Sequence, residues 1–311
     1  MPLRSLAFLL LSAAVIHGQG LPQQGLPQQD LPKFKADSTL VLIPVSVTDR
    51  SNRFVLGLHK QDFQLLEDGV EQKIVSLSGE DAPLSVGLLY DRSGSMADKQ
   101  RTSREAAAQF LSTLSPADET FLVDFGDEAK VSQPFTSHPD DIDLKLSLLL
   151  TGGLTALLDA VHLGLHEMSN ARNPRKALLI VSDGGDNHST YTAQEIQGLV
   201  READVQIFAM GVFEPSLPRS LSTAEVTGPR LLAEIAEQTG GRAFSANTGS
   251  ELPNAATRIA IELRNQYVLA YQPVNQQKDG KYRRVEVRVD PQHGLPALKV
   301  HWRLGYYAPD R

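Results

Sequence analysis

The feature that most restricts the fold of this chain is a regular alternation of apolar and amphipathic segments in its central part. Apolar runs of strand length stand at residues 84–90, 120–126, 177–182 and 205–212, with a weaker one at 242–246. Segments with helical periodicity separate or follow them at residues 101–114, 139–150, 155–169, 193–203, 229–238 and 252–265. Strands that alternate with helices predict a doubly wound, largely parallel sheet with helices on both faces. We therefore expect an α/β domain over residues 83–266.

Strand-like patterns also stand on both sides of this domain. Residues 38–82 and residues 267–311 contain short stretches in which every second residue is apolar, as in 41–47. Neither flank has enough strands to bury both faces of a sheet. We expect the two flanks to pair in one small β-sandwich into which the α/β domain is inserted.

The first part of the chain has the pattern of an export signal followed by a tether. Residues 1–20 carry a positive charge near their start at Arg4, continue with an apolar stretch from Leu6 to Ile16, and end in small residues. Residues 21–37 are rich in Pro and Gln and predict an extended linker. No later apolar run approaches the length that spans a bilayer. These observations predict a secreted or periplasmic protein without stable membrane insertion once the signal is removed.

Composition excludes several classes of function. The net charge is −7, which argues against binding to nucleic acid or to anionic membrane surfaces. The chain has no cysteine, so it can form neither disulfides nor a thiolate metal site, and no lipid-modified cysteine follows the signal.

A cluster of oxygen-bearing side chains follows the first strand of the expected α/β domain. Asp91, Ser93 and Ser95 stand at alternate positions directly after the apolar run 84–90. Carboxylate and hydroxyl oxygens suit a small divalent cation such as Mg²⁺, which needs only one or two carboxylates. In an ordinary strand-to-helix turn, the same residues would instead cap the following helix.

Two later segments can complete such a site. Thr155 follows a Gly-Gly pair, and Asp183 stands directly after the run 177–182. Ligands of open α/β sheets bind beyond the carboxyl ends of the strands, where the strand order reverses. We expect the five residues to converge there. Because they carry only two formal charges and leave a coordination position open, a carboxylate from a partner protein is the natural sixth ligand.

These three segments resemble the metal-ion-dependent adhesion site of von Willebrand factor type A domains. The resemblance covers roughly residues 84–266 in order and spacing. It implies a Rossmann-like six-stranded fold and metal-assisted protein binding. It also implies direct coordination by Ser93, Ser95 and Thr155, and direct or water-mediated coordination by Asp91 and Asp183.

The flanks are similar to the acidobacterial-type subfamily of secreted, A-domain-related proteins, a subfamily that implies no known ligand. The similarity is carried by Asp62-Phe63, Glu67-Asp68-Gly69-Val70 and Arg303-Leu304-Gly305-Tyr306.

The main hypothesis is therefore a protein-binding or adhesion module that is not an enzyme. It would use Mg²⁺, with Mn²⁺ or Ca²⁺ as alternative ions, and would bind a protein that presents an acidic side chain. The alternative is a structural or envelope-assembly protein in which the metal only stabilises the fold and partners add a strand to the β-sandwich. The identity of the partner and the oligomeric state stay open.

Other motifs suggest a zinc site, a hydrolase or a calcium loop, and each of them lacks part of the required sequence pattern. His162 and His166 have a spacing found in zinc sites, but the residues between them include no acidic side chain. A hydrolase that used His188 as base for Ser93 would lack a nucleophile-elbow sequence. The stretch from Asp183 to Gln194 does not follow the calcium-loop pattern. Residues 186–188 are read as solvated, and the long loop 214–228 is hypothesised to shape partner choice.

Overall fold

The computed structural model describes residues 40–79, 82–213, 223–246, 251–290 and 298–310, with only the helical backbone of 223–226. The expected signal and linker, residues 1–37, lie outside this part of the chain. Among the helices it describes, none combines the length and the apolar character needed to cross a membrane.

The central domain is built on a six-stranded sheet in the order β10-β9-β8-β5-β6-β7. Its strands are β5 (Leu84–Asp91), β6 (Glu119–Phe125), β7 (Ala129–Thr136), β8 (Arg175–Ser182), β9 (Gln206–Val212) and β10 (Ala243–Ala246). All pairs are parallel except β6 with β7. Every residue of β5, β6 and β9 is buried, which explains their continuous apolar sequences.

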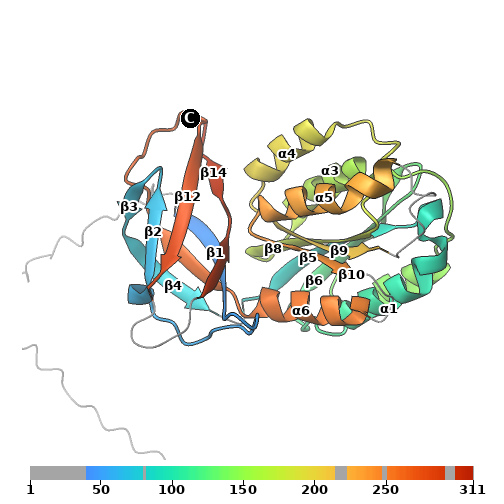
Figure 1. Ribbon diagram of the computed structural model, residues 1–311, viewed down its shortest axis with the longest axis horizontal. Coiled ribbons are helices and arrows are strands. Elements are labelled where there is room, and N and C mark those ends of the chain that lie inside the picture. The colour runs from blue at the N-terminus through green and yellow to red at the C-terminus, as the bar shows by residue number, and fades with distance from the viewer. Residues whose placement is uncertain (1–39, 80–81, 214–222, 247–250, 291–297, 311) are drawn as a thin grey trace, which may run out of the picture. The chain divides into compact units, whose positions relative to one another are not determined.

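Helices cover both faces of this sheet (Figure 1). They are α1 (Gln100–Leu111), α2 (Pro139–Leu148), α3 (Leu157–Glu167), α4 (Ala193–Glu202), α5 (Thr223–Glu237) and α6 (Leu252–Arg264). Buried residues of α1, α2 and α6 form one apolar core with the sheet, and those of α3, α4 and α5 form a second core on the opposite face. The expected doubly wound α/β fold is confirmed.

The strand order reverses at β5. The chain passes from β5 to β6 on one side and later returns to place β8 on the other side of β5. Asp91 is the last residue of β5, and Asp183 directly follows β8. The two carboxylates therefore leave neighbouring parallel strands at the same edge of the sheet, which is where this architecture binds ligands.

Two elements of this domain differ from the sequence-based expectation. Strand β7 was not predicted because it is a half-exposed edge strand that contains Pro134, so it shows neither an apolar run nor a clean alternation. Helix α5 begins at Thr223, six residues before the expected start at 229. Pro229 thus lies inside the helix, although proline is more usual in a first turn.

The loop expected over 214–228 is correspondingly shorter. Residues 223–228 belong to α5, and residues 214–222 lie outside the described part of the chain.

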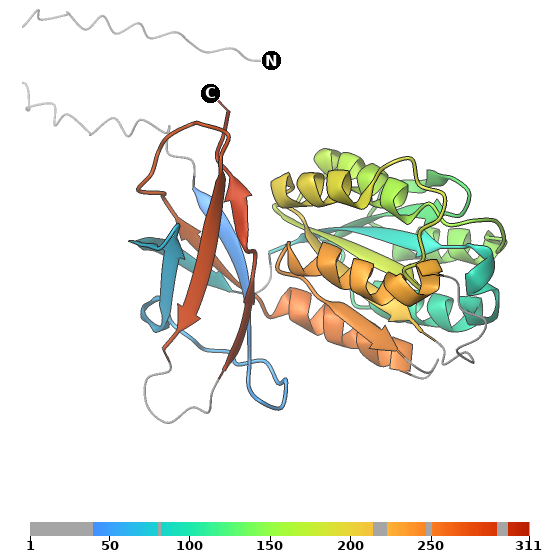
Figure 2. The ribbon, with the colours of Figure 1, turned by 45° about the horizontal axis from the view of Figure 1, so that its top comes forward.

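The flanking segments form two four-stranded sheets, in the orders β13-β1-β11-β4 and β14-β12-β2-β3 (Figure 2). The strands are β1 (Val41–Thr48), β2 (Phe63–Glu67), β3 (Val70–Gln72), β4 (Ile74–Gly79), β11 (Tyr267–Tyr271), β12 (Tyr282–Val289), β13 (Lys299–Trp302) and β14 (Gly305–Tyr307). Each sheet contains strands from both flanks, because β11 pairs with β1 and β4, and β12 pairs with β2.

The inner faces of these sheets share one apolar core, with Ile43, Leu65 and Leu269 fully buried. A buried carboxylate lies in the same region. Glu67 accepts hydrogen bonds from the hydroxyls of Tyr271 and Tyr306 at 2.7 and 2.8 Å, so this buried polar side chain is hydrogen-bonded.

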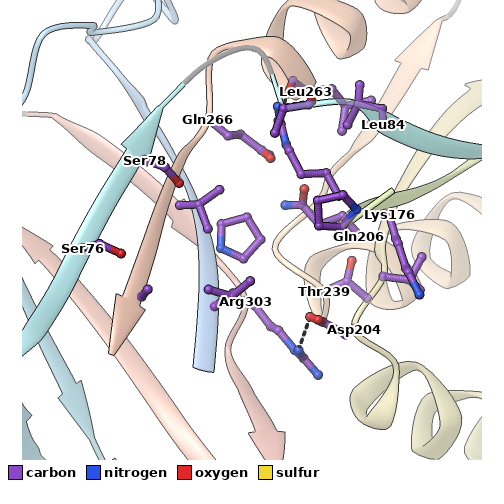
Figure 3. A pocket seen from close by; sticks show the side chains of 18 residues that line it. Ser76, Ser78, Leu84, Lys176, Asp204, Gln206, Thr239, Leu263, Gln266 and Arg303 are labelled. Atoms are coloured by element: carbon purple, nitrogen blue, oxygen red, sulfur yellow. Dashed lines mark hydrogen bonds and ion pairs between the residues drawn. The ribbon is translucent and has the colours of Figure 1, made fainter. Parts of the chain in front are cut away.

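Residues of the β-sandwich and of the α/β domain together line a cavity of about 170 Å³ (Figure 3). The guanidinium of Arg303 donates to the carboxylate of Asp204 at 2.8 Å beside it, as the dashed line in Figure 3 marks. None of the five predicted metal ligands is among the residues that line this cavity.

Candidate metal centre

The loop that follows β5 places Asp91 in a fully buried position with both carboxylate oxygens hydrogen-bonded. The backbone N–H of Ser93 donates to Oδ1 at 2.8 Å, and the hydroxyl of Ser182 donates to Oδ2 at 2.6 Å. Burial raises the pKa of Asp91 to about 6, these hydrogen bonds oppose the shift, and the nearby charge of Asp183 adds to it. The two carboxylates therefore lie close enough to repel each other.

Ser93 and Ser95 bring two hydroxyls together in the same loop. Their Oγ atoms are 3.2 Å apart, with Ser93 buried and Ser95 exposed. Ser93 precedes a short 3-10 helix, η2 (Gly94–Lys99), but its side chain makes no capping hydrogen bond with it. The reading of these serines as ordinary helix caps is therefore not supported for Ser93.

The Gly-Gly segment before Thr155 lies against the first loop. The N–H of Gly152 donates to the carbonyl of Arg92 at 2.8 Å, and the N–H of Gly94 donates to the carbonyl of Gly153 at 3.0 Å. Gly153 has a φ of 84°, a conformation that favours glycine, and an added Cβ would collide with the Asp127 carboxylate. Glycine is therefore favoured at position 153 by its backbone conformation and by the Asp127 side chain beside it.

Thr155 is buried, lies two residues before α3, and is held by a third loop. Its N–H donates to the side-chain oxygen of Asn187 at 2.9 Å, and its carbonyl accepts from the N–H groups of Asn187 and His188 at 3.0 Å each. The sequence-based reading of residues 186–188 as solvated loop residues missed this role. Asn187 and His188 are exposed, yet Asn187 connects the Thr155 loop to the Asp183 loop.

The structure adds two charged residues that sequence reasoning did not assign. Lys99, at the end of η2, donates from its ammonium group to Oδ2 of Asp183 at 3.1 Å. Arg92 donates to the fully buried Asp124 at 2.7 Å and so anchors the loop between the predicted ligands. The position of Arg92 beside the motif was visible in the sequence, but its partner lies on another strand.

The residues present fit a small divalent cation of the magnesium type. They supply two carboxylates and three hydroxyls, all hard oxygen donors, and no nitrogen or sulfur donor. Within the described part of the chain, no three His, Cys, Asp or Glu side chains gather as a metal site. A cation at this edge of the sheet would therefore depend on the Ser and Thr hydroxyls as well as on Asp91 and Asp183.

The weaker sequence-based readings gain no support from the geometry. The ring of His162 stacks on that of Tyr191, with centroids 4.2 Å apart, which is a packing contact. His166 is exposed, and His188 contributes its backbone N–H to the Thr155 loop.

Similarity to known proteins agrees with this fold. Residues 86–185 match the protein family described as von Willebrand factor type A domain. An uncharacterized protein from Borreliella burgdorferi is 25% identical over 159 residues, which make up 47% of this chain and 46% of that protein. The matched region thus spans less than half the length of that relative.

Two solved structures share the fold at low sequence identity. A von Willebrand factor type A protein from Catenulispora acidiphila has a TM-score of 0.51 at 12% identity, over 88% of this chain and 74% of that chain. Proximal thread matrix protein 1 from the mussel byssus has a TM-score of 0.50 at 16% identity, over 64% of this chain and 51% of that chain. Residues 86–185 are therefore similar in sequence to von Willebrand factor type A domains, and they form part of the six-stranded sheet that carries the candidate site.

Proposed function

We propose that this chain is a secreted or periplasmic, non-enzymatic module that binds a partner protein through a divalent cation. Mg²⁺ is the proposed ion, with Mn²⁺ and Ca²⁺ as alternatives, and an acidic side chain of the partner completes its coordination. The proposed ligands are Asp91, Ser93, Ser95, Thr155 and Asp183. The location is inferred from residues 1–20, and the flanking motifs support membership of the acidobacterial-type subfamily.

One observation carries the proposal. Three loops that are far apart in the sequence are joined by hydrogen bonds at the point where the strand order reverses. Together they hold two buried carboxylates near the two adjacent hydroxyls of Ser93 and Ser95. Hard oxygen donors with a low total charge support a weakly held cation that keeps exchangeable positions for a partner.

Calorimetry with Mg²⁺ and Mn²⁺ tests the metal site. The chain should bind one ion, and Asp91→Asn and Asp183→Asn should each weaken binding by at least about tenfold, because each removes a charged ligand. Asp98→Asn is the matched control, since Asp98 is an exposed carboxylate of the nearby 3-10 helix η2. If the two ligand variants and the control bind equally well, the site is not at this position.

A capture experiment then tests the function. Immobilised protein should retain a partner from an extracellular fraction in Mg²⁺ and release it in EDTA, and the Thr155→Val variant should retain less. Retention that is the same in Mg²⁺ and EDTA would contradict metal-dependent binding.

A second candidate function, strand addition, is favoured by one feature of the β-sandwich. Strand β4 is the edge of its sheet, contains no charged residue, and exposes Val75. Uncharged edge strands are suited to pairing with another chain. In this structural or envelope-assembly role, Mg²⁺ would raise the thermal stability without changing the capture of partners, and Val75→Lys would abolish capture.

A further inference from the structure

The side chain of Lys99 reaches one of the proposed metal ligands. Its ammonium nitrogen lies 3.1 Å from Oδ2 of Asp183. Only 14% of the Lys99 side chain and 3% of the Asp183 side chain are exposed. This is therefore an ion pair largely shielded from water, unlike the exposed pairs on the helices of this domain, such as Arg101 with Glu105.

Asp91 and Asp183 are two buried carboxylates of the candidate site, and Lys99 is the positively charged side chain that contacts one of them. Of the ion pairs within the described part of the chain, the one that reaches Asp91 or Asp183 is formed by Lys99. The other partners are neutral: Ser93 and Ser182 donate to Asp91, and the N–H of Gly185 donates to Oδ1 of Asp183 at 3.2 Å. Arg92, although adjacent to Asp91 in sequence, binds Asp124 instead.

Two neighbouring buried carboxylates are unfavourable unless a positive charge offsets them. The ammonium group supplies one positive charge, and a divalent cation would supply two. The two cations repel each other when both lie at Asp183, and the repulsion is strong where water is largely excluded. Binding of the metal and formation of the Lys99–Asp183 pair are therefore linked, and each must weaken the other to the same extent.

We propose that Lys99 is a built-in counter-ion of the metal centre. It holds Asp183 when no divalent cation is bound, it lowers the affinity of the site for the cation, and it keeps the metal-free domain stable. This inference rests on the proposed function, because it takes Asp183 to be a metal ligand.

The test compares Mg²⁺ and Mn²⁺ binding by calorimetry in the full chain and in three variants at position 99. Lys99→Met and Lys99→Gln remove the charge and should bind each ion at least about tenfold more tightly. Lys99→Arg keeps the charge and should stay within about threefold of the unmodified chain. Lys145→Met is the control, because Lys145 is an exposed lysine of α2 and its loss changes the net charge equally.

Thermal unfolding provides a second measurement that does not depend on the heat of metal binding. In EDTA, Lys99→Met and Lys99→Gln should unfold at a lower temperature than the unmodified chain, because Asp183 is left without its cation. Saturating Mg²⁺ should raise their unfolding temperature by more than it raises that of the unmodified chain.

The outcomes separate this inference from the proposed function. Equal affinities of the unmodified chain and the charge-removing variants would overturn the role of Lys99 and leave the metal site standing. Binding by Lys99→Met but not by the unmodified chain would support the role of Lys99 and contradict metal-dependent function of the protein as it exists. Absence of binding in every variant would overturn both.

Discussion

At the scale of single residues, two buried carboxylates of the α/β domain are held by cations that come from other segments. Asp124 is fully buried and is paired with Arg92, while Lys99 faces Asp183. The five proposed ligands could be nominated from the sequence because four of them follow the apolar runs of β5 and β8 and Thr155 follows a Gly-Gly pair, in a recognisable order. Their charged neighbours could not, because a lysine or arginine in a loop has no pattern that reveals which carboxylate it meets.

A pH effect is expected from His301, a half-buried residue of β13. Burial first, and then the charges of Arg242 and Lys299, lower its pKa from 6.5 to about 4. Because the folded protein binds this proton less tightly than the unfolded chain, His301 favours folding fully above pH 6.5, and this contribution is lost as the pH falls toward about 4. Because water screens part of this effect, we expect the free energy of unfolding to fall by about 1 kcal/mol.

Urea unfolding at several pH values between 7.5 and 4.5 measures this effect. The free energy of unfolding of His301→Gln should fall less over this range than that of the unmodified chain. Parallel profiles of the two proteins would show that His301 is protonated as easily in the folded state as in the unfolded one.

At the scale of elements, the position of α5 depends on a close contact between two glycines. Gly184 follows Asp183 with a φ of 78°, and Gly228 is a buried residue of α5. A Cβ added to Gly228 would lie 2.5 Å from the carbonyl oxygen of Asp183, and one added to Gly184 would collide with the backbone of Gly228. The helix can therefore approach the Asp183 loop only because neither residue carries a side chain.

Replacement of Gly228 by Ala should destabilise the protein by about 2 kcal/mol, because the backbone must move to admit a methyl group. Gly198→Ala is the matched control: Gly198 also lies in a helix, α4, and an added Cβ would have no atom within 4 Å. The control should be stabilised by about 0.5–1 kcal/mol. Chemical denaturation measures both, and equal stabilities would show that α5 is free to shift away from the Asp183 loop.

At the scale of the whole molecule, the β-sandwich is assembled from both flanks of the inserted domain. Strand β11 lies between β1 and β4, and β12 pairs with β2, so the first flank cannot complete either sheet alone. The apolar core contains residues of both flanks.

A chain that ends at residue 266 should therefore lose the β-sandwich. Residues 40–79 would keep their apolar side chains but lose the strands that cover them, so limited proteolysis should cut within this segment. A chain that lacks residues 1–38 is the control, since it retains every described strand. If residues 40–79 resist the protease equally in both truncated chains, the first flank folds without the second.

The sequence and the tertiary structure determine different features of this protein. The sequence by itself determined the alternation of strands and helices and nominated five oxygen-bearing residues, because the alternation and each of the three short motifs that hold these residues are local patterns along the chain. The sequence did not predict strand β7 or the start of α5, because an exposed edge strand and a proline inside a helix depend on their surroundings.

Only the tertiary structure decided which side chains meet at the candidate site. The members of each contacting pair are separated by tens of residues in the sequence, as are Lys99 and Asp183, Asn187 and Thr155, and Gly184 and Gly228. Their contacts arise from the strand order, which brings the ends of β5 and β8 together. Long-range pairings of this kind depend on how the layers pack, and packing is set by the whole fold rather than by any local pattern.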